Sequence, residues 1–180
     1  MLGAEDSNAA KAVGEVLKQS FGKLLKHARK NIELKQACAE ALQSLDELGG
    51  DVPDADNFFH PFKLACDSDD PKLASIALET MQYLTNYGFL SGRGPDPFHP
   101  AETDRCLMDS VVEAICSITN SGDENVELLM LRALLTAVHV PNSAVHLKSL
   151  MLTLKTCFTL HRISRHTTSQ RSAQVTLTQM

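Results

Sequence analysis

The sequence lacks tryptophan and carries two tyrosines, so that aromatic residues make up 5% of its 180 residues. It also lacks any run of about 18 apolar residues, the length that a membrane-spanning helix requires. Its first residues contain no apolar segment of the kind that a secretory signal needs. The net charge of -5 offers no general attraction for nucleic acids or anionic membranes. We therefore expect neither nucleic-acid binding nor direct insertion into a membrane.

Cysteine is present without a pairing pattern. The five residues are scattered and lie mostly inside apolar helical stretches: Cys38, Cys66, Cys106, Cys116 and Cys157. An odd number of cysteines in such settings fits reduced thiols that serve as small core side chains. This predicts a cytoplasmic protein.

The sequence contains no motif that would carry catalysis or hold a cofactor. The zinc motifs H-E-x-x-H and C-x-x-C and the phosphate-binding glycine spacings are absent. His139 and His146 flank Pro141 and could share a metal, but ordinary turn or helix-end histidines are the simpler interpretation. The turn DSDDP at 67–71 starts like a calcium loop and then places proline where a ligand is needed, so Asp70 is better interpreted as a helix N-cap. We expect no catalytic residue, no cofactor and no metal site, and hence no enzyme.

Apolar residues recur at helical spacing through most of the chain, and runs of β-branched residues are few. Asn31 and Asp70 are expected N-caps, and Gly49-Gly50 is a typical helix end. The expected helices cover residues 7–27, 31–48, 58–64, 71–87, 103–118, 128–138, 145–158 and a short last segment, 173–180. We predict an all-α fold, an irregular armadillo/HEAT-like α-solenoid of about seven or eight helices. It forms one domain over residues 1–180, with a flexible Gly/Pro-rich loop at about 88–100 as its hinge.

Two of these helices suggest how the stack is built. The patterns LLMLRALLTAV at 128–138 and VHLKSLMLTLKTCF at 145–158 are separated by a break at Pro141-Asn142, which predicts an antiparallel pair. A repeat is also visible. A shift of 53 positions along the sequence places Leu73, Ile76, Leu78 and Met81 on Val126, Leu129, Leu131 and Leu134. The apolar pattern near 173–180 ends without a stop signal, so we expect the chain to be an excerpt of a longer protein.

Two kinds of surface residue stand out. Basic residues gather on the first two helices and again near the C-terminus, where Arg162 and Arg165 lie. Solvated helix faces explain them most simply, with contact to an acidic partner or a neighbouring domain as the alternative. Tyr83, Tyr87 and Phe89 cluster at the end of one helix, and rigid amphipathic aromatics at a rim are favoured binding anchors. Plugging the end of the stack is an equally good interpretation of these aromatics.

Four short strings, in this order, resemble one known module. They are PFKLAC at 61–66, YGFLSG at 87–92, RALLTAV at 132–138 and TLTQM at 176–180. Together they resemble the N-terminal dimerisation and cyclophilin-binding (DCB) domain of the large, brefeldin-A-inhibited type of ARF guanine-nucleotide exchange factor. The resemblance runs from about Lys11 to Met180 and is strongest after Asp54.

The resemblance implies a non-catalytic, armadillo-like helical stack that contributes to self-association and packs against the homology region that follows it in the same chain. It also implies recruitment to the trans-Golgi, through binding of an Arf-like small GTPase in the GTP state. Two departures are visible. The linker from Gly49 to Asp56 is shorter than in animal members, and Tyr83 stands where those members are expected to carry a basic residue. Tyr87 and Gly88 match the family pattern.

The leading hypothesis is thus a targeting domain in vesicle transport, cytoplasmic and peripherally recruited to trans-Golgi membranes. The candidate GTPase surface consists of Tyr83, Tyr87, Phe89 and Leu90. The alternative is a scaffold for self-association as a homodimer, or for docking on the same exchange factor. Its candidate residues are Arg162, Arg165, Val175, Leu177 and Met180.

Overall fold

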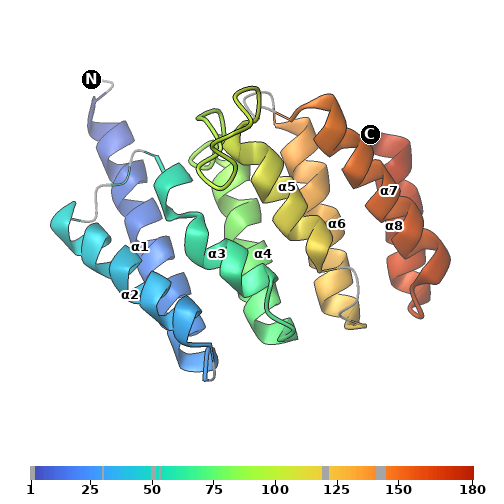
Figure 1. Cartoon of the computed structure of the whole chain (residues 1–180), viewed down its shortest axis with the longest axis horizontal. Helices are drawn as coiled ribbons and strands as arrows, with labels where there is room; N and C mark the ends of the chain where they lie inside the picture. Colours follow the sequence, from blue (N-terminus) through green and yellow to red (C-terminus); the bar gives the residue numbers. More distant parts are fainter. Residues whose placement is uncertain (1–2, 30, 50–51, 53, 119–121, 141–144) are drawn as a thin grey trace.

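The computed structural model describes residues 3–29, 31–49, 52, 54–118, 122–140 and 145–180. For residues 3–8 it describes the backbone alone. The described part of the chain contains eight α-helices (Figure 1). The helices are α1 (Gly3–His27), α2 (Ile32–Glu47), α3 (His60–Cys66), α4 (Pro71–Asn86), α5 (Leu107–Ser117), α6 (Glu124–His139), α7 (Leu147–Ile163) and α8 (Thr167–Gln179). A 3₁₀ turn, η1 (Asp56–Phe58), precedes α3. No strand occurs among these residues, so the predicted all-α fold is confirmed.

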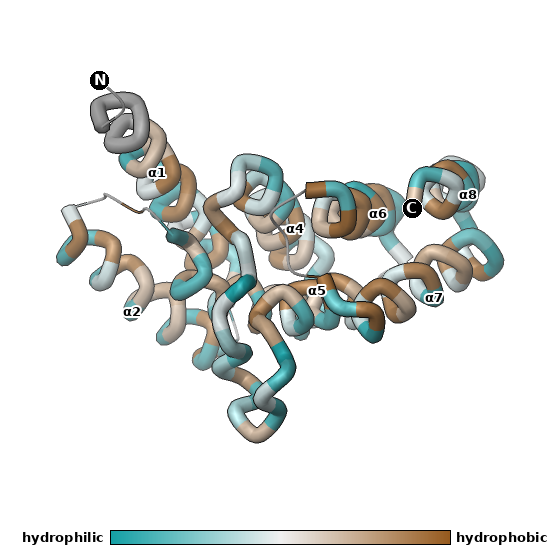
Figure 2. Tube along the Cα trace, turned by 90° about the horizontal axis from the view of Figure 1, so that it is seen from above, coloured by the Kyte–Doolittle hydropathy of each residue, from teal (hydrophilic) through white to brown (hydrophobic). Residues whose placement is uncertain are grey.

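The helices form two layers (Figure 2). Helices α1, α4, α6 and α8 follow one another in one layer, and α2, α3, α5 and α7 in the other. Each helix of one layer packs against a helix of the other, which gives four successive pairs: α1/α2, α3/α4, α5/α6 and α7/α8. This is the architecture of the predicted α-solenoid.

The predicted pairing of the two apolar helices is wrong in one respect. They are α6 and α7, and the structure assigns them to different pairs: α6 packs mainly on α4 and α8, and α7 mainly on α8 and α5. The predicted break at Pro141-Asn142 lies outside the described residues. An apolar stripe shows that a helix face is buried but does not identify the neighbour that buries it.

The 53-residue repeat corresponds to structurally equivalent helices. Helices α4 and α6 are neighbours in the same layer, and each begins at an aspartate that caps it. The Asp70 carboxylate accepts a hydrogen bond from Lys72 N at 2.9 Å, and the Asp123 carboxylate accepts one from Val126 N at 3.0 Å. The predicted caps of α4 and of α2, where Asn31 accepts from Leu34 N at 3.0 Å, are confirmed.

One continuous apolar core runs from α1 to α8. Near its N-terminal end, the rings of Phe21 and Phe62 stack with centroids 5.1 Å apart. All five cysteines are buried thiols outside any disulfide, as predicted. Burial raises the pKa of Cys38 and Cys116 to about 11 and that of Cys157 to about 12. The thiols of Cys38, Cys116 and Cys157 are therefore core side chains rather than nucleophiles.

Helix α5 begins four residues later than the predicted start at Thr103. The backbone N–H groups of Leu107 and Met108 donate to the carbonyls of Gly94 and Gly92, each at 3.0 Å. The chain before them is extended at Cys106, with φ -107° and ψ 162°. The preceding loop thus satisfies donors at the helix start, and this tertiary contact fixes the boundary.

The loop between α4 and α5, where the sequence predicts a flexible hinge, is bound to the stack at both ends. The Asp56 carboxylate accepts hydrogen bonds from the backbone N–H of Ser91 at 2.9 Å and of Gly92 at 3.0 Å. Further along, Asp96 is buried and accepts a hydrogen bond from Ser110 Oγ of α5 at 2.7 Å. These contacts fasten the loop at two places, so any hinge motion must break them.

Candidate interaction surfaces

An exposed aromatic pair lies at the C-terminal end of α4. The rings of Tyr83 and Tyr87 lie with centroids 4.6 Å apart, and the two residues are 38% and 61% exposed. The chain turns sharply after them, because Gly88 has φ +77°. The pair therefore lies at the end of a helix, where both tyrosines are exposed to solvent.

The other two residues of the predicted partner surface behave differently. Phe89 is half-buried and packs against the core. Leu90 is 1% exposed, which corrects the prediction that it forms part of a surface. The cause is the helix end itself: the N–H groups of Phe89 and Leu90 both donate to the carbonyl of Leu84, at 2.9 and 3.1 Å. This turns the Leu90 side chain back into the core.

A shallow hollow lies next to this pair, among the C-terminal ends of α4, α6 and α8. It is lined by Asn86, Leu135, Thr136, His139, Val140 and Gln179. Because Asn86 directly precedes Tyr87, the hollow and the aromatic pair belong to one end of this helix layer. Together they form a part-apolar surface with a polar rim.

Helix α7 carries a second exposed apolar surface, which was not among the predicted partner surfaces. Leu147, Met151 and Phe158 are 74%, 58% and 57% exposed, and half-buried Leu154 completes a stripe at spacings of 4, 3 and 4 residues. Apart from Leu160, the buried residues of α7 are small, and most are polar: Ser149, Thr153, Thr156 and Cys157. The helix thus presents several large apolar side chains to solvent and mostly small ones to the stack. The 4-3-4 spacing was a sequence signal for this stripe.

The predicted self-association residues near the C-terminus are divided between surface and core. Arg162, Arg165 and Val175 are exposed, and Val175 is 53% exposed. Leu177 and Met180 are half-buried and pack against the core of the stack itself. At this end of the molecule, α7 thus exposes more large apolar residues than α8 does.

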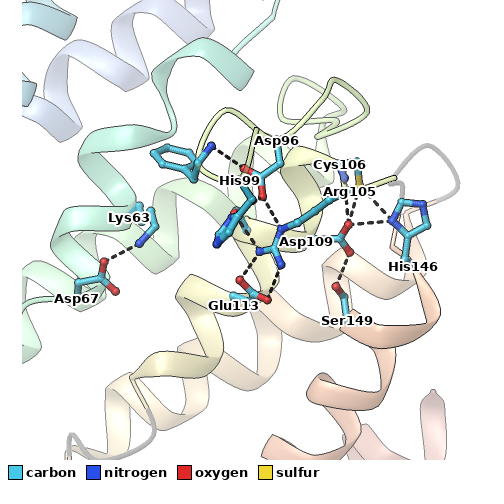
Figure 3. A network of polar contacts seen from close by, with 12 residues as sticks. Lys63, Asp67, Asp96, His99, Arg105, Cys106, Asp109, Glu113, His146 and Ser149 are labelled. Atoms are coloured by element: carbon cyan, nitrogen blue, oxygen red, sulfur yellow. Dashed lines mark hydrogen bonds and ion pairs between the residues drawn. The ribbon is translucent and has the colours of Figure 1, made fainter. Parts of the chain in front are cut away.

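A buried polar network secures the loop before α5 (Figure 3). Asp96 accepts hydrogen bonds from Arg105 Nε at 2.6 Å and Ser110 Oγ at 2.7 Å. The Arg105 guanidinium also pairs with Glu113 on α5. Burial alone would raise the pKa of Asp96, but the hydrogen bonds from Ser110, Arg105, Phe98 N and His99 outweigh it and lower the pKa.

A second group in the network joins α5 to α7. Asp109 accepts hydrogen bonds from Cys106 N at 3.1 Å, His146 Nδ1 at 2.8 Å and Ser149 Oγ. Burial by itself would raise the pKa of Asp109, but its bonds with Ser149, His146 and Cys106 lower it to about 2. The thiol and the carboxylate approach the same ring nitrogen of His146, so the three residues do not form a Cys-His-Asp nucleophilic triad, in which the acid holds the opposite nitrogen.

The structure does not bring together the two histidines considered as a metal pair. His139 Nδ1 lies 3.1 Å from the carbonyl of Leu135 within its own helix, whereas His146 contacts Asp109. In the acidic turn, Asp70 caps α4, and Asp67 pairs with Lys63 at 2.8 Å. The capping interpretation of this turn is confirmed.

An α-solenoid with exposed apolar patches is the architecture typical of protein-binding modules. The particular family follows from comparison with known proteins. Residues 8–180 match the family described as Mon2/Sec7/BIG1-like, dimerisation and cyclophilin-binding domain. The chain therefore belongs to the DCB family, a non-catalytic domain, as its sequence motifs predicted.

Among relatives, the chain is similar to Brefeldin A-inhibited guanine nucleotide-exchange protein 1 of Mus musculus, with 37% identity over 129 residues, and to that of Homo sapiens, with 36%. These matches cover 71% of the chain and 7% of each relative. It is also 25% identical to Brefeldin A-inhibited guanine nucleotide-exchange protein 2 of Arabidopsis thaliana, over 97% of the chain and 11% of that protein. The chain thus corresponds to a small part of these exchange proteins. Within the described residues, no helix has the length and apolarity needed to cross a membrane.

Proposed function

We propose that this domain captures a GTP-loaded Arf-like small GTPase and thereby recruits an ARF guanine-nucleotide exchange factor to trans-Golgi membranes for vesicle transport. The observation that supports this proposal is the Tyr83–Tyr87 pair on the end of α4, with rings 4.6 Å apart and open to solvent. Membership of the DCB family supplies the class of protein in which such a surface acts.

The physical fit is between two part-apolar surfaces. The switch segments of small GTPases are ordered by the γ-phosphate and released on hydrolysis, so a partner that contacts them distinguishes the two nucleotide states. Tyrosines present large apolar rings with a polar tip at low conformational cost and are enriched at binding hot spots. Because Leu90 is buried, the proposed contact surface is reduced to Tyr83, Tyr87 and the exposed part of Phe89, with the adjoining hollow as its rim.

The test is binding of the purified domain to a trans-Golgi Arf-like GTPase, loaded in parallel with a GTP analogue and with GDP. We expect binding with the analogue only, and about tenfold weaker binding for Tyr87→Ala, corresponding to a hot-spot contribution of about 1.4 kcal/mol. Phe158→Ala is the matched control, because it removes an equally exposed aromatic from α7. Absence of binding in both nucleotide states, or equal affinity of Tyr87→Ala and the original chain, would contradict the proposal.

A second function, self-association or docking on the same exchange factor, is favoured by the α7 stripe. Solvent-exposed Leu147, Met151 and Phe158 form a seam with 3.5-residue periodicity, the pattern that receives another helix. The partner would be a second copy of the chain or the downstream homology region. The exposed Arg162 lies in the last turn of the same helix, and the exposed Arg165 follows just after its end.

Light scattering over a range of protein concentrations tests self-association. We expect the average mass to rise with concentration and this rise to disappear in the double variant Met151→Ser, Phe158→Ser. Both residues are exposed, so the double variant should retain the unfolding free energy of the original chain to within about 0.5 kcal/mol for each change. Tyr87→Ala serves as the control and should leave the mass unchanged. A constant monomer mass would contradict self-association through the stripe.

A further inference from the structure

Three side chains with different metal-ligating atoms converge between the third and fourth helix pairs (Figure 3). Cys106 immediately precedes α5, Asp109 lies in the first turn of α5, and His146 immediately precedes α7. Cys106 and His146 are 40 positions apart in the sequence. The fold, not the sequence, brings this set together, and the proposed GTPase surface does not include it.

The distances among the three atoms match the edges of a metal tetrahedron. Cys106 Sγ lies 3.4 Å from Asp109 Oδ2 and 3.6 Å from His146 Nδ1, and the last two atoms are 2.8 Å apart. Tetrahedral zinc with its usual bond lengths places a sulfur about 3.5 Å from an oxygen or nitrogen ligand, and nitrogen about 3.3 Å from oxygen. Two edges already fit. The third would lengthen by about half an ångström when a metal replaces the hydrogen bond between His146 and Asp109.

The donor set also suits zinc in charge and in softness. Thiolate, imidazole and carboxylate are all zinc ligands, and the thiolate disfavours magnesium and calcium. The thiolate and the carboxylate together would neutralise a dication. The nearby Arg105 does not oppose this, because its guanidinium is already paired with Asp96 and Glu113.

The neighbouring residues orient the ligands and leave the cluster accessible to a metal ion from solvent. Ser149 Oγ donates to the other carboxylate oxygen of Asp109, an arrangement that fixes a carboxylate ligand from behind. The side chain of Asp109 is 7% exposed, whereas that of His146 is 53% exposed. A hollow of about 400 Å³ lies in front of the cluster and is lined in part by Glu102, Asp104 and the exposed Lys148. It has room for a water molecule as a fourth ligand.

A purely capping role accounts less well for the cysteine. Cys106 is the N-cap of α5, and Asp109 closes the capping box with it. Serine, threonine, aspartate and asparagine are the preferred N-caps, because their oxygen accepts strongly, whereas sulfur is a weak acceptor. Cysteine is therefore a weaker N-cap at this position than those residues, but it adds a metal ligand.

From this geometry we propose that Cys106, Asp109 and His146 bind a zinc ion, with water completing the tetrahedron. The ion links the start of α5 to the start of α7 and so fixes the last helix pair to the rest of the stack. This inference is independent of the proposed GTPase binding.

The test uses the 180-residue chain, freed of metal with a chelator, reduced, and carrying no histidine tag. Zn²⁺ is titrated by calorimetry, and Co²⁺ by absorption spectroscopy, which reports tetrahedral geometry and thiolate ligation directly. We expect one ion per chain, thiolate-to-cobalt charge transfer, and a higher unfolding temperature with zinc.

Two variants remove ligands without removing the helix cap. Cys106→Ser supplies a better N-cap than cysteine and should fold at least as well in the absence of metal, and His146→Gln alters a side chain that is half-exposed. Each should weaken zinc binding at least about 100-fold, more than the usual loss for a supporting residue. His139→Ala, which removes a histidine outside the cluster, should bind zinc like the original chain. Failure to bind one ion, cobalt spectra without thiolate ligation, or undiminished affinity in both ligand variants would overturn the proposal.

Discussion

Asp96 shows at the scale of a single residue how the loop before α5 is held. Its side chain is completely buried, and the carboxylate accepts hydrogen bonds from Arg105 Nε at 2.6 Å, Ser110 Oγ at 2.7 Å and Phe98 N at 3.0 Å. Removing one partner of a buried ion pair leaves the other charge uncompensated, which costs about 3–5 kcal/mol. Asp96 is therefore a structural anchor whose charge matters.

We predict that Asp96→Asn lowers the unfolding free energy at pH 7 by about 3 kcal/mol. The folded-state pKa of Asp96 is lowered, so its contribution is fully present above the unfolded carboxyl pKa of about 4 and is lost as the pH falls through the folded value. The difference between the original chain and the variant should thus shrink below pH of about 4. Urea unfolding at several pH values measures this. Asp104→Asn, in the same loop but exposed, should change little, and a pH-independent difference would contradict the role of the charge.

Gly92 is a residue whose backbone leaves no room for a side chain. It has φ +62°, and a Cβ placed on it would lie 2.6 Å from both Cβ and N of Met108. We predict that Gly92→Ala lowers the unfolding free energy by about 2 kcal/mol or more, through torsional strain and the clash together. Denaturant unfolding of two matched variants separates these causes.

Gly88 has φ +77° with open space around it, and Gly94 has neither restriction. Gly88→Ala should therefore cost about 1 kcal/mol, from torsion alone, and Gly94→Ala less than about 0.5 kcal/mol. If Gly92→Ala is no more destabilising than Gly88→Ala, the close approach to Met108 does not constrain the fold.

At the scale of elements, α4 and α6 begin in the same way. Each begins at an aspartate cap, Asp70 or Asp123, and the two caps are separated by the same 53 positions as the apolar stripes. Both helices lie in the same layer and pack on each other. Capping fixes where each helix starts.

We predict that Asp123→Ala and Asp70→Ala each lower the unfolding free energy by about 1 kcal/mol. Asparagine retains the accepting oxygen, so Asp123→Asn should lose no more than a few tenths of a kcal/mol. Thermal and denaturant unfolding of the four chains provides the measurement. An equal loss for alanine and asparagine would show that charge, not capping geometry, stabilises the start of α6.

At the scale of the whole molecule, the continuous core makes neighbouring helix pairs depend on one another. Helix α7 packs against α5, and α8 packs against α6, so the fourth pair covers the third. In a stack of this kind, stability is a sum of contributions from each pair and each interface between pairs. The end pair therefore contributes both its own stability and one interface.

We predict that a chain ending at residue 140, which lacks the fourth pair, unfolds at a lower temperature and aggregates as its concentration rises. The newly exposed faces of α5 and α6 are apolar, and such patches promote association. Differential scanning calorimetry and light scattering report the two effects. Unchanged unfolding temperature would mean that the fourth pair is only loosely coupled to the rest.

The sequence by itself determined the local properties of this protein. Helical periodicity gave the all-α class and the approximate helices, polar caps such as Asn31 and Asp70 marked helix starts, and the order of four short strings identified the DCB family. These features depend on residues within a few turns of one another, where propensity and capping act.

Tertiary structure decided which helices are neighbours and which side chains face them. Packing assigned α6 and α7 to different pairs, turned Leu90 into the core, and gave α7 small buried residues with a large apolar face outside. It also brought Cys106 to His146, 40 positions away. A stripe of apolar residues fixes how much surface must be buried, but the partner that buries it depends on the fit of the whole stack.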